Sequence, residues 1–510
     1  MQVTLNKLSH RLSGTDFGKA VLWLMFSITV LVLALFFGLL AVTASPILIG
    51  MAAGLVVGVF LLMKPDLLIW LILVLGLVMG ALVSMAGPQF SKITWAVSIL
   101  GFVLLILSLF NFLLTGKSKG QPAFIWFGLA FLVLTIVATM AQWHSTGEVI
   151  AGIKRFFQAY GLMFAFATLA LSSREMGRLQ KLLLAIALLQ LPFALYELFV
   201  LVPKRGGLAL SSETTDVVAG TFGANLQGGS PNSVMVIYLL IVASFLVARW
   251  RSGSIRSGTF YLLVLPCLLP LGMGETKIAV VMLPLAGFVL IRKDLVRAPL
   301  RYLPALLAVV LLAMMLTYVY VTVIMHSTLD EVVQSTMRYN IGDQGYSQGQ
   351  LLNRLTSITF WFQQQGSHDP VGFLVGNGLG SSYTSFGELG GHLGMKYQHY
   401  GINLTAASTM LWDTGVIGFA LFTGMLASAW VAAGRLHHSV SDPAVKADTL
   451  AIQAAISLFF LSLVYSDSIV NLVPMEIIFA AVLGYLGYLL KTHGRAGMPA
   501  LSSYRAHSHV

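Results

Sequence analysis

The chain has 510 residues, of which 57% are hydrophobic and only 10% are charged, and its mean hydropathy is +0.86. These values exclude a string of soluble domains and place the chain among integral membrane proteins. Because lipid offers no hydrogen-bond partner to exposed backbone, and because the apolar runs approach twenty residues, we expect an all-α polytopic fold. The net charge is +11, and the Lys and Arg residues fall mostly in short loops between apolar runs, which argues against nucleic-acid binding.

Apolar runs of suitable length predict about fourteen transmembrane helices. The first run follows three basic residues and is too long for a signal-peptide core, so we expect an uncleaved first span. Eleven spans precede residue 326, three fall within residues 406–490, and a tail covers residues 491–510. The runs lie near residues 21–42, 46–63, 67–85, 94–114, 123–141, 156–171, 182–201, 232–250, 259–273, 278–291, 303–325, 407–432, 451–472 and 474–490.

The distribution of basic residues predicts the topology. If the N-terminus is cytoplasmic, 21 of the 30 Lys and Arg residues fall on the cytoplasmic side, as the positive-inside rule expects. Both termini are then cytoplasmic and residues 326–405 form a periplasmic loop. An anionic ligand is expected among the nine basic residues left outside, although pairing with acidic residues or lipid head groups also explains any one of them. The nine are Lys92, Lys154, Arg155, Lys204, Arg205, Lys277, Arg338, Arg354 and Lys396.

Residues 326–405 form the only long polar interval of the sequence. Thr328 and Glu331 fit a capping box that opens a short helix running to about Met337. Apolar residues at helical spacing predict a second, amphipathic helix over residues 351–365, lying on the bilayer or on the transmembrane bundle. A loop of this length with helices of its own is usually functional.

Several familiar sites do not fit this interval. The glycine-rich turn at residues 375–380 follows no βαβ unit, so it is no dinucleotide site; its N–H groups could face an anion, although a simple turn also explains it. Residues 274–277 lack the spacing of a P-loop. His392 and His399 have no neighbours at metal-ligand spacing, and no nucleophile elbow is present, so we expect neither a metal nor another cofactor.

What remains is a set of cations, histidines and aromatic residues in one polar interval. Guanidinium groups match phosphate oxygens bidentately, and a neutral histidine accepts a proton near neutral pH. Aromatic rings can pack against the apolar faces of sugars, although Tyr and Trp also anchor membrane interfaces. This combination is suited to glycosyl transfer from a lipid-linked diphosphate.

Four stretches, in order, resemble the bacterial O-antigen polymerase and O-antigen ligase superfamily. Lys277 stands where the superfamily usually has Arg, and Arg338 with Gly349 is spaced like a motif of polymerase outer loops. The match extends over roughly residues 219–425. The four stretches are Ala219–Gly223 with Pro231 and Asn232; Gly272–Lys277; Asn353 and Arg354 with Trp361, Pro370, Gly372 and Gly376–Gly380; and His399 with Leu411–Gly418.

The resemblance implies a glycosyltransferase at the periplasmic face of the bacterial inner membrane. Its substrate would be an undecaprenyl-diphosphate-linked glycan within the lipid bilayer, with no nucleotide sugar and no metal. Arg354, Lys277 and Arg338 would hold the diphosphate, and His399 would orient or deprotonate the acceptor hydroxyl. Trp361, Tyr383 and Tyr397 are candidate glycan contacts.

The resemblance does not choose the acceptor. A polymerase of O-antigen or exopolysaccharide would join repeat units, and a chain-length regulator and a flippase of the same pathway would be its partners. A ligase would transfer the glycan to lipid A core or another acceptor. From other classes, a lipid-linked oligosaccharide flippase or transporter and a membrane scaffold with a partner-binding loop remain alternatives.

Overall fold

The computed structural model of the protein defines most of its membrane helices. The residues that the structure describes are 27, 64–86, 93–114, 120–204, 217–225, 231–273, 278–319, 321–322, 328–342, 345, 351–366, 368–385 and 389–494. By packing, the chain divides into residues 1–68 and residues 69–510, and the account that follows concerns the second unit.

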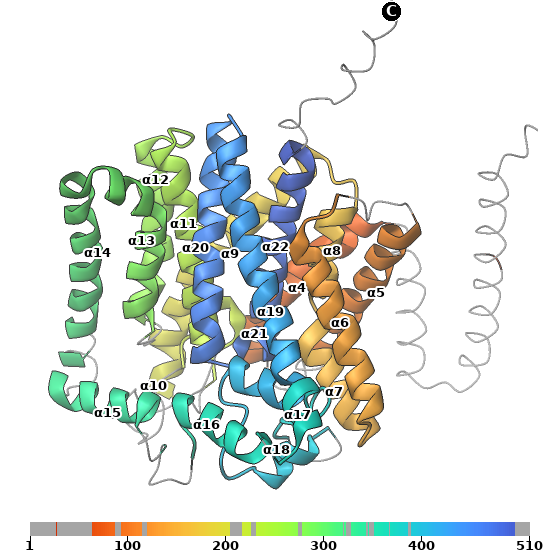
Figure 1. Ribbon diagram of the computed structural model, residues 1–510. Coiled ribbons are helices and arrows are strands. Elements are labelled where there is room, and N and C mark those ends of the chain that lie inside the picture. Colours follow the sequence, from red (N-terminus) through yellow and green to blue (C-terminus); the bar gives the residue numbers. More distant parts are fainter. Residues whose placement is uncertain are drawn as a thin grey trace, which may run out of the picture. The chain divides into compact units, whose positions relative to one another are not determined.

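Helices form all the regular secondary structure of the described residues (Figure 1). The fold is therefore all-α, as the composition predicts. The elements are α4 (Pro65–Ala86), α5 (Ile93–Leu114), α6 (Ala123–Ala141), α7 (Thr146–Phe157), α8 (Tyr160–Thr168), α9 (Ser173–Tyr196), a π-helical turn (Glu197–Leu201), α10 (Val202–Lys204), a 3-10 turn (Gly220–Phe222), α11 (Asn232–Arg251), α12 (Ser257–Met273), α13 (Ala279–Arg297), α14 (Pro299–Val319), α15 (Leu329–Ile341), α16 (Arg354–Gln365), α17 (Pro370–Val375), α18 (His392–Lys396), α19 (Ala406–Ser439), α20 (Pro443–Tyr465), α21 (Ser468–Asn471) and α22 (Val473–His493).

Eight helices of the described part are long and apolar enough to cross a membrane, which makes the chain a multi-pass membrane protein. They are α4, α5, α6, α9 with its extension to Lys204, α11, α19, α20 and α22. The predicted spans at residues 21–42 and 46–63 lie outside the described residues, apart from Ser27. The other predicted spans correspond to α8, with nine residues, to α12, with 17 residues, to α13, which carries several charges, and to α14, of which Pro299–Met315 forms a shorter apolar helix.

The centre of the unit is built by close helix contacts. Helix α19 packs against α6 and α20, and α22 packs against α8, which in turn packs against α5. Gly101 on α5 faces the backbone of Gln158, where a Cβ atom would collide with the carbonyl group. The small residue lets α5 approach the junction of α7 and α8, which carries buried polar groups.

The polar interval folds across one end of this bundle, the lower end in Figure 1, where α15 to α18 lie. The predicted capping box is confirmed: Glu331 N–H donates to Thr328 Oγ1 (3.4 Å), and Thr328 N–H donates to the Glu331 carboxylate (3.2 Å). Helix α15 runs to Ile341, four residues further than predicted. The second predicted helix starts at Arg354 because Asn353 caps it, accepting the N–H groups of Leu355 and Thr356.

An aromatic cluster attaches α16 to the bundle. Trp361 stacks on Phe373 (5.0 Å between ring centroids), and Tyr397 packs against Phe360 and the fully buried Trp412 of α19. Helix α16 therefore contacts the bundle through Ile358, Phe360 and Trp361. Three residues of the predicted apolar face, Leu351, Leu355 and Phe362, are instead exposed.

Candidate functional site

Helix α19 is interrupted at Gly415, which has φ of 64° and ψ of −172°. The glycine-rich turn supplies the partners that the interruption requires. The Trp412 carbonyl accepts the N–H of Asn377 (2.9 Å) and its side-chain Nδ2 (3.0 Å), and the Asp413 carbonyl accepts the N–H of Gly378 (3.1 Å). A broken helix inside a membrane bundle is stable only when its free backbone groups are satisfied in this way.

The same turn surrounds the carboxylate of Asp413, which is almost completely buried. It accepts the N–H of Gly380 (3.0 Å), the N–H of Ser382 (2.8 Å) and the hydroxyl of Ser381 (2.9 Å). The backbone at the end of the turn thus donates to a carboxyl side chain of the protein itself.

Two glycines make this arrangement possible. Gly376 and Gly415 both have positive φ, 81° and 64°. A Cβ atom on Gly415 would collide with the backbone of Leu374 and Gly376, and one on Gly376 would collide with the backbone of Asp413 and Thr414. The turn and the broken helix therefore interlock backbone to backbone.

Beside this turn lies Arg155 of α7, of which only 3% is exposed. Its Nε donates to the side-chain oxygen of Asn471 (2.8 Å), and its guanidinium lies over the ring of Tyr383 at 4.1 Å. The nearest carboxylate oxygen, on Asp467, is 3.8 Å from Nη2. Neither Nη1 nor Nη2 donates a hydrogen bond to any residue that the structure describes. Burying a guanidinium with unpaired N–H groups costs free energy unless an anion accepts their hydrogen bonds and balances the charge.

Further ionisable groups surround Arg155. Burial lowers the pKa of Lys154, while the nearby carboxylate of Glu476 opposes this shift. Glu476 accepts a hydrogen bond from Gln158 (2.5 Å). Burial raises the pKa of Asp467, against the opposing effects of Arg155 and of the hydrogen bond from Asn471. The cluster consequently offers a bidentate donor for an anion next to a carboxylate that can accept a proton.

Glu148, two turns before Arg155 on α7, fixes this helix to the polar interval. Its buried carboxylate accepts the N–H of His392 (2.9 Å) and lies 3.1 Å from His392 Nδ1, and the ring of His144 stacks on His392 at 4.4 Å. Helix α18 thereby holds the start of α7, and Arg155 follows two turns further along the same helix.

No protein-family model matches the chain, and a search of curated proteins finds no match. The site is therefore described by its own geometry. Within the residues that the structure describes, no group of three or more His, Cys, Asp or Glu side chains is placed to hold a metal ion.

Arg354, which the resemblance implies as a diphosphate ligand, lies beside the same segment as Arg155. Its Nε donates to the Tyr465 carbonyl (2.6 Å), its Nη1 donates to Asn340 (2.7 Å), and its guanidinium lies over the Tyr465 ring at 4.3 Å. Asp467, which faces Arg155, is only two residues further along the chain. The two arginines thus contact opposite ends of one three-residue stretch, 465–467.

The other predicted site residues are distributed differently. Tyr383 lies beneath Arg155, whereas Trp361 is buried in the aromatic cluster and Tyr397 joins that cluster with its hydroxyl donating to Gln364. His399 is exposed in the turn after α18. Arg338 lies on α15, but its side chain is outside the description, as is the whole of Lys277.

Sequence reasoning placed the centre of the site in the polar interval and missed Arg155 and Lys154. A signal for them was present: they are adjacent members of the nine basic residues that break the positive-inside pattern. The partners of Arg155 lie more than 200 residues away in the sequence, so no local spacing could point to this residue.

Proposed function

We propose that the protein is a glycosyltransferase of the bacterial inner membrane that polymerises undecaprenyl-diphosphate-linked repeat units into a surface polysaccharide, either O-antigen or exopolysaccharide. The proposal includes fourteen spans, cytoplasmic termini and a periplasmic polar interval. The observation that carries it is the buried guanidinium of Arg155, whose Nη1 and Nη2 have no hydrogen-bond partner among the described residues.

A lipid-linked diphosphate would complete this guanidinium. Arg155 would bind two phosphate oxygens, Lys154 would add a second charge, and Arg354 would approach from the other side of residues 465–467. The acceptor hydroxyl would attack the anomeric carbon as the bond to the diphosphate breaks, and these cations would stabilise the negative charge that develops on the leaving group.

The proton of the acceptor hydroxyl needs a base. His399 is the residue that the resemblance implies, and its exposed position suits contact with a large glycan. Lys277 and Arg338 keep their proposed roles at the diphosphate. Tyr383 under Arg155 and Tyr397 would contact sugars, while the burial of Trp361 gives that residue a supporting role in packing.

The deciding experiment measures polysaccharide chain length in cells that carry single substitutions. Arg155→Gln should abolish long chains, and Arg354→Ala and His399→Ala should shorten them. The matched control is Lys396→Gln, which removes an exposed cation from α18 of the same region. Normal chains from Arg155→Gln at a normal protein level would overturn the proposal.

Ligase activity would use the same diphosphate site with a different acceptor. It predicts that substitutions at Arg155 leave chain length unchanged and instead reduce transfer of complete glycan to lipid A core or another acceptor. Analysis of both the free and the transferred glycan separates the two activities.

A flippase or transporter of lipid-linked oligosaccharide is the second candidate, and specific observations favour it. Discontinuous helices and ionisable groups buried at membrane depth are typical of transport pathways, and α19 is interrupted next to Asp413, with Glu476 also buried. Transport of a labelled lipid-linked unit by purified protein in liposomes, without chain elongation, would establish this alternative.

A further inference from the structure

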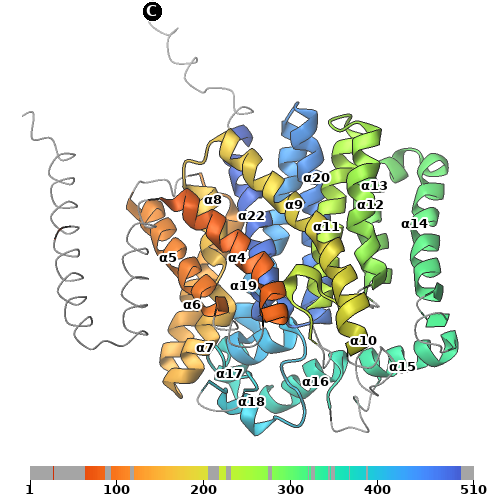
Figure 2. The same ribbon diagram turned by 180° about the vertical axis from the view of Figure 1, so that it is seen from behind.

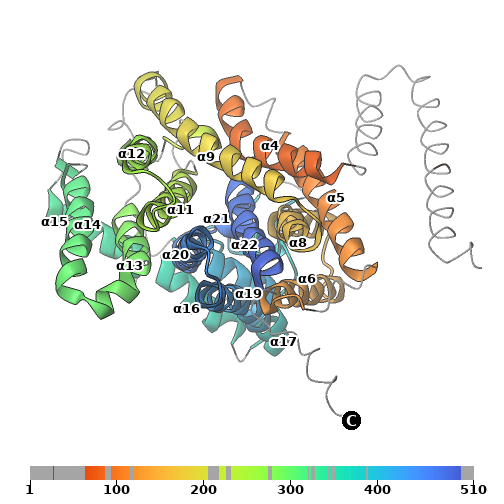
Figure 3. The ribbon, with the colours of Figure 1, turned by 90° about the horizontal axis from the view of Figure 1, so that it is seen from above.

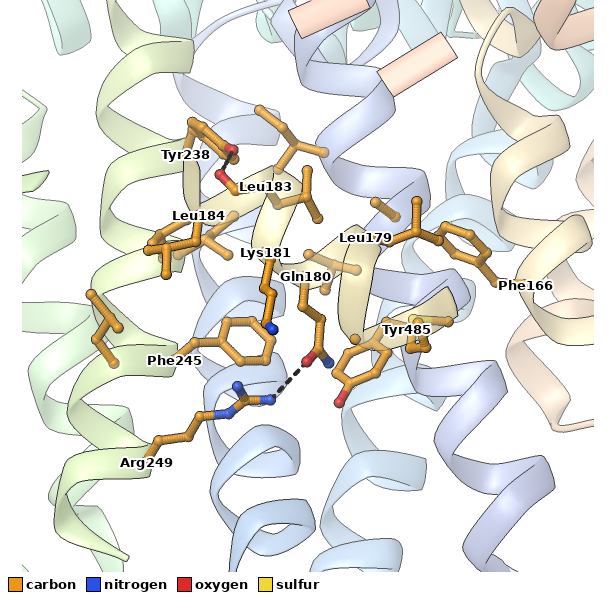
Figure 4. A pocket seen from close by; sticks show the side chains of 18 residues that line it. Phe166, Leu179, Gln180, Lys181, Leu183, Leu184, Tyr238, Phe245, Arg249 and Tyr485 are labelled. Carbon is orange, nitrogen blue, oxygen red and sulfur yellow. Dashed lines mark hydrogen bonds between the residues drawn. The ribbon is translucent and has the colours of Figure 1, made fainter. Parts of the chain in front are cut away.

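A cavity of about 290 Å³ lies between α8, α9, α11 and α22. Most of its wall is apolar, and Figure 4 shows Leu183, Leu184 and Tyr238 along it. This volume is close to the lower end of the range of about 300–1,000 Å³ found for small-molecule sites. Figure 2 and Figure 3 show that α9, which supplies much of the wall, runs obliquely across the bundle.

Polar groups gather at one end of this cavity, where Figure 4 shows Gln180, Lys181 and Arg249 together. The charge of Arg249 is already compensated, because its Nε and Nη2 donate to the two carboxylate oxygens of Asp448 (2.6 and 2.7 Å). Its Nη2 also donates to Gln180 (3.2 Å). Lys181 remains as the cation of the cavity without a counter-charge in the described part of the chain.

Lys181 belongs to a row of three exposed cations on the first turns of α9. Arg174, Arg178 and Lys181 are spaced by four and three residues and so share one face of the helix. None of the three forms an ion pair with a residue that the structure describes. Like charges at this spacing destabilise a helix, and an external anion would remove that cost.

We propose that the cavity holds one acyl chain of a membrane phospholipid, with the anionic head group of this lipid against Arg178 and Lys181. An apolar chain suits the apolar wall, and basic residues at a membrane surface attract anionic lipids. The site is separate from the Arg155 cluster: Asp448 is in the second turn of α20 while Asp467 follows its last residue, a separation of roughly 25–30 Å along a helix. The proposal is independent of the proposed function.

Gly177 provides a test that spares the fold. It lines the cavity, and a Cβ atom added there would meet no heavy atom within 4 Å, so the backbone of α9 accepts a side chain at this position and the ring of Gly177→Phe should compete with a ligand for the cavity. Gly258 on α12 has the same open surroundings and does not line the cavity, which makes Gly258→Phe the matched control. Equal melting temperatures of the two variants establish that both are folded.

The measurement is native mass spectrometry of the full-length protein after incubation with equal amounts of phosphatidylglycerol and phosphatidylcholine in detergent. The wild type should retain one phosphatidylglycerol. Gly177→Phe should reduce retention at least tenfold, and Lys181→Gln should reduce the preference for the anionic lipid about fivefold. Gly258→Phe and Arg256→Gln, which removes an exposed cation outside the cavity, should retain the lipid as the wild type does.

Three results would overturn the proposal: equal retention of the two lipids, full retention by Gly177→Phe, or replacement of the phospholipid by an added polyprenyl phosphate at equal concentration. The last result would assign the cavity to a lipid-linked substrate instead.

Discussion

Arg155 and Arg249 lie near aspartates at opposite ends of the bundle. They differ in how far other side chains satisfy the hydrogen bonds and the charge of the guanidinium group. Arg249 forms a bidentate pair with Asp448, which also accepts the hydroxyl of Tyr485 (2.5 Å). Arg155 is more deeply buried, yet its nearest carboxylate oxygen is 3.8 Å away and two of its nitrogens lack partners among the described residues. An arginine whose guanidinium is paired within the protein links the helices it contacts. A buried arginine that lacks hydrogen-bond partners indicates a ligand site.

The carboxylates near the two arginines explain this difference. Asp448 accepts hydrogen bonds directly from its guanidinium partner. Near Arg155, by contrast, Asp467 accepts a hydrogen bond from Asn471 (2.7 Å), and Asp413 accepts those of the glycine-rich turn. Because neither aspartate accepts a hydrogen bond from Arg155, its Nη1 and Nη2 stay available for an external anion.

The same substitution at both arginines should have opposite consequences, and Arg155→Gln should give the largest effect on activity. Loss of a preorganised donor at the reacting group typically lowers the rate by about 100-fold or more. We expect product formation in membranes to fall by this amount while the melting temperature of the purified protein changes little. Arg155→Lys should recover only part of the rate, because an ammonium lacks the bidentate fork. Full activity of Arg155→Lys would contradict bidentate binding.

Arg249→Gln should instead lower stability. It leaves the buried Asp448 with only Tyr485 as a partner, and removing one member of such a pair costs about 3 kcal/mol, somewhat less here because Arg249 is partly exposed. Unfolding in detergent, followed by tryptophan fluorescence, measures the change. The double variant Arg249→Met with Asp448→Leu should regain much of the loss, and a double variant as unstable as Arg249→Gln would argue against pairing as the cause.

Gly415→Ala tests the interlock that keeps Asp413 satisfied. With φ of 64° and ψ of −172°, Gly415 has a backbone conformation essentially restricted to glycine, which costs about 1–3 kcal/mol for a residue with a side chain. The collision with Leu374 and Gly376 adds to this cost. We expect a lower melting temperature together with reduced activity. Gly177→Ala is the control, because open surroundings and higher helix propensity should raise stability by up to about 1 kcal/mol. Similar losses in both variants would refute the interlock.

The smallest effect concerns Lys154 and pH. Burial lowers the pKa of Lys154 in the folded protein below its ordinary value of 10.5, so the unfolded chain binds the proton more tightly. The wild type should therefore gain stability relative to Lys154→Gln as pH rises from the lowered pKa to 10.5. Melting temperatures of both proteins between pH 7 and 10.5 measure this gain. A constant difference over that range would show that burial does not perturb Lys154.

The sequence predicted those features that depend on neighbouring residues. Mean hydropathy and apolar runs are local quantities, and they identified a multi-pass α-helical membrane protein. Capping is local as well: Thr328 and Glu331 are only three residues apart, and together they predicted where α15 begins.

Features that depend on distant partners were not predictable. The run at residues 156–171 predicts a continuous span, whereas in the structure α7 ends at Phe157 and α8 begins at Tyr160. Between them, the side chain of Gln158 donates a hydrogen bond to Glu476, more than 300 residues later in the sequence. Hydropathy averaged over a window of residues does not reveal such a contact, because a single polar residue changes the average little. For the same reason the sequence identifies Arg155 only as one of the basic residues outside the cytoplasm. It does not show that Asn471, Tyr383 and Asp467 surround this residue.

The interlock between Gly376 and Gly415 also limits how this protein can be recombined with others. A polar interval between membrane helices invites exchange as a cassette, cut at its two junctions with the bundle. Here the cassette would carry the hydrogen-bond donors that complete α19, while α19 would carry the carboxylate that organises the cassette. Chimaeras joined near residues 326 and 405 should misfold unless residues 406–418 are transferred with the insert.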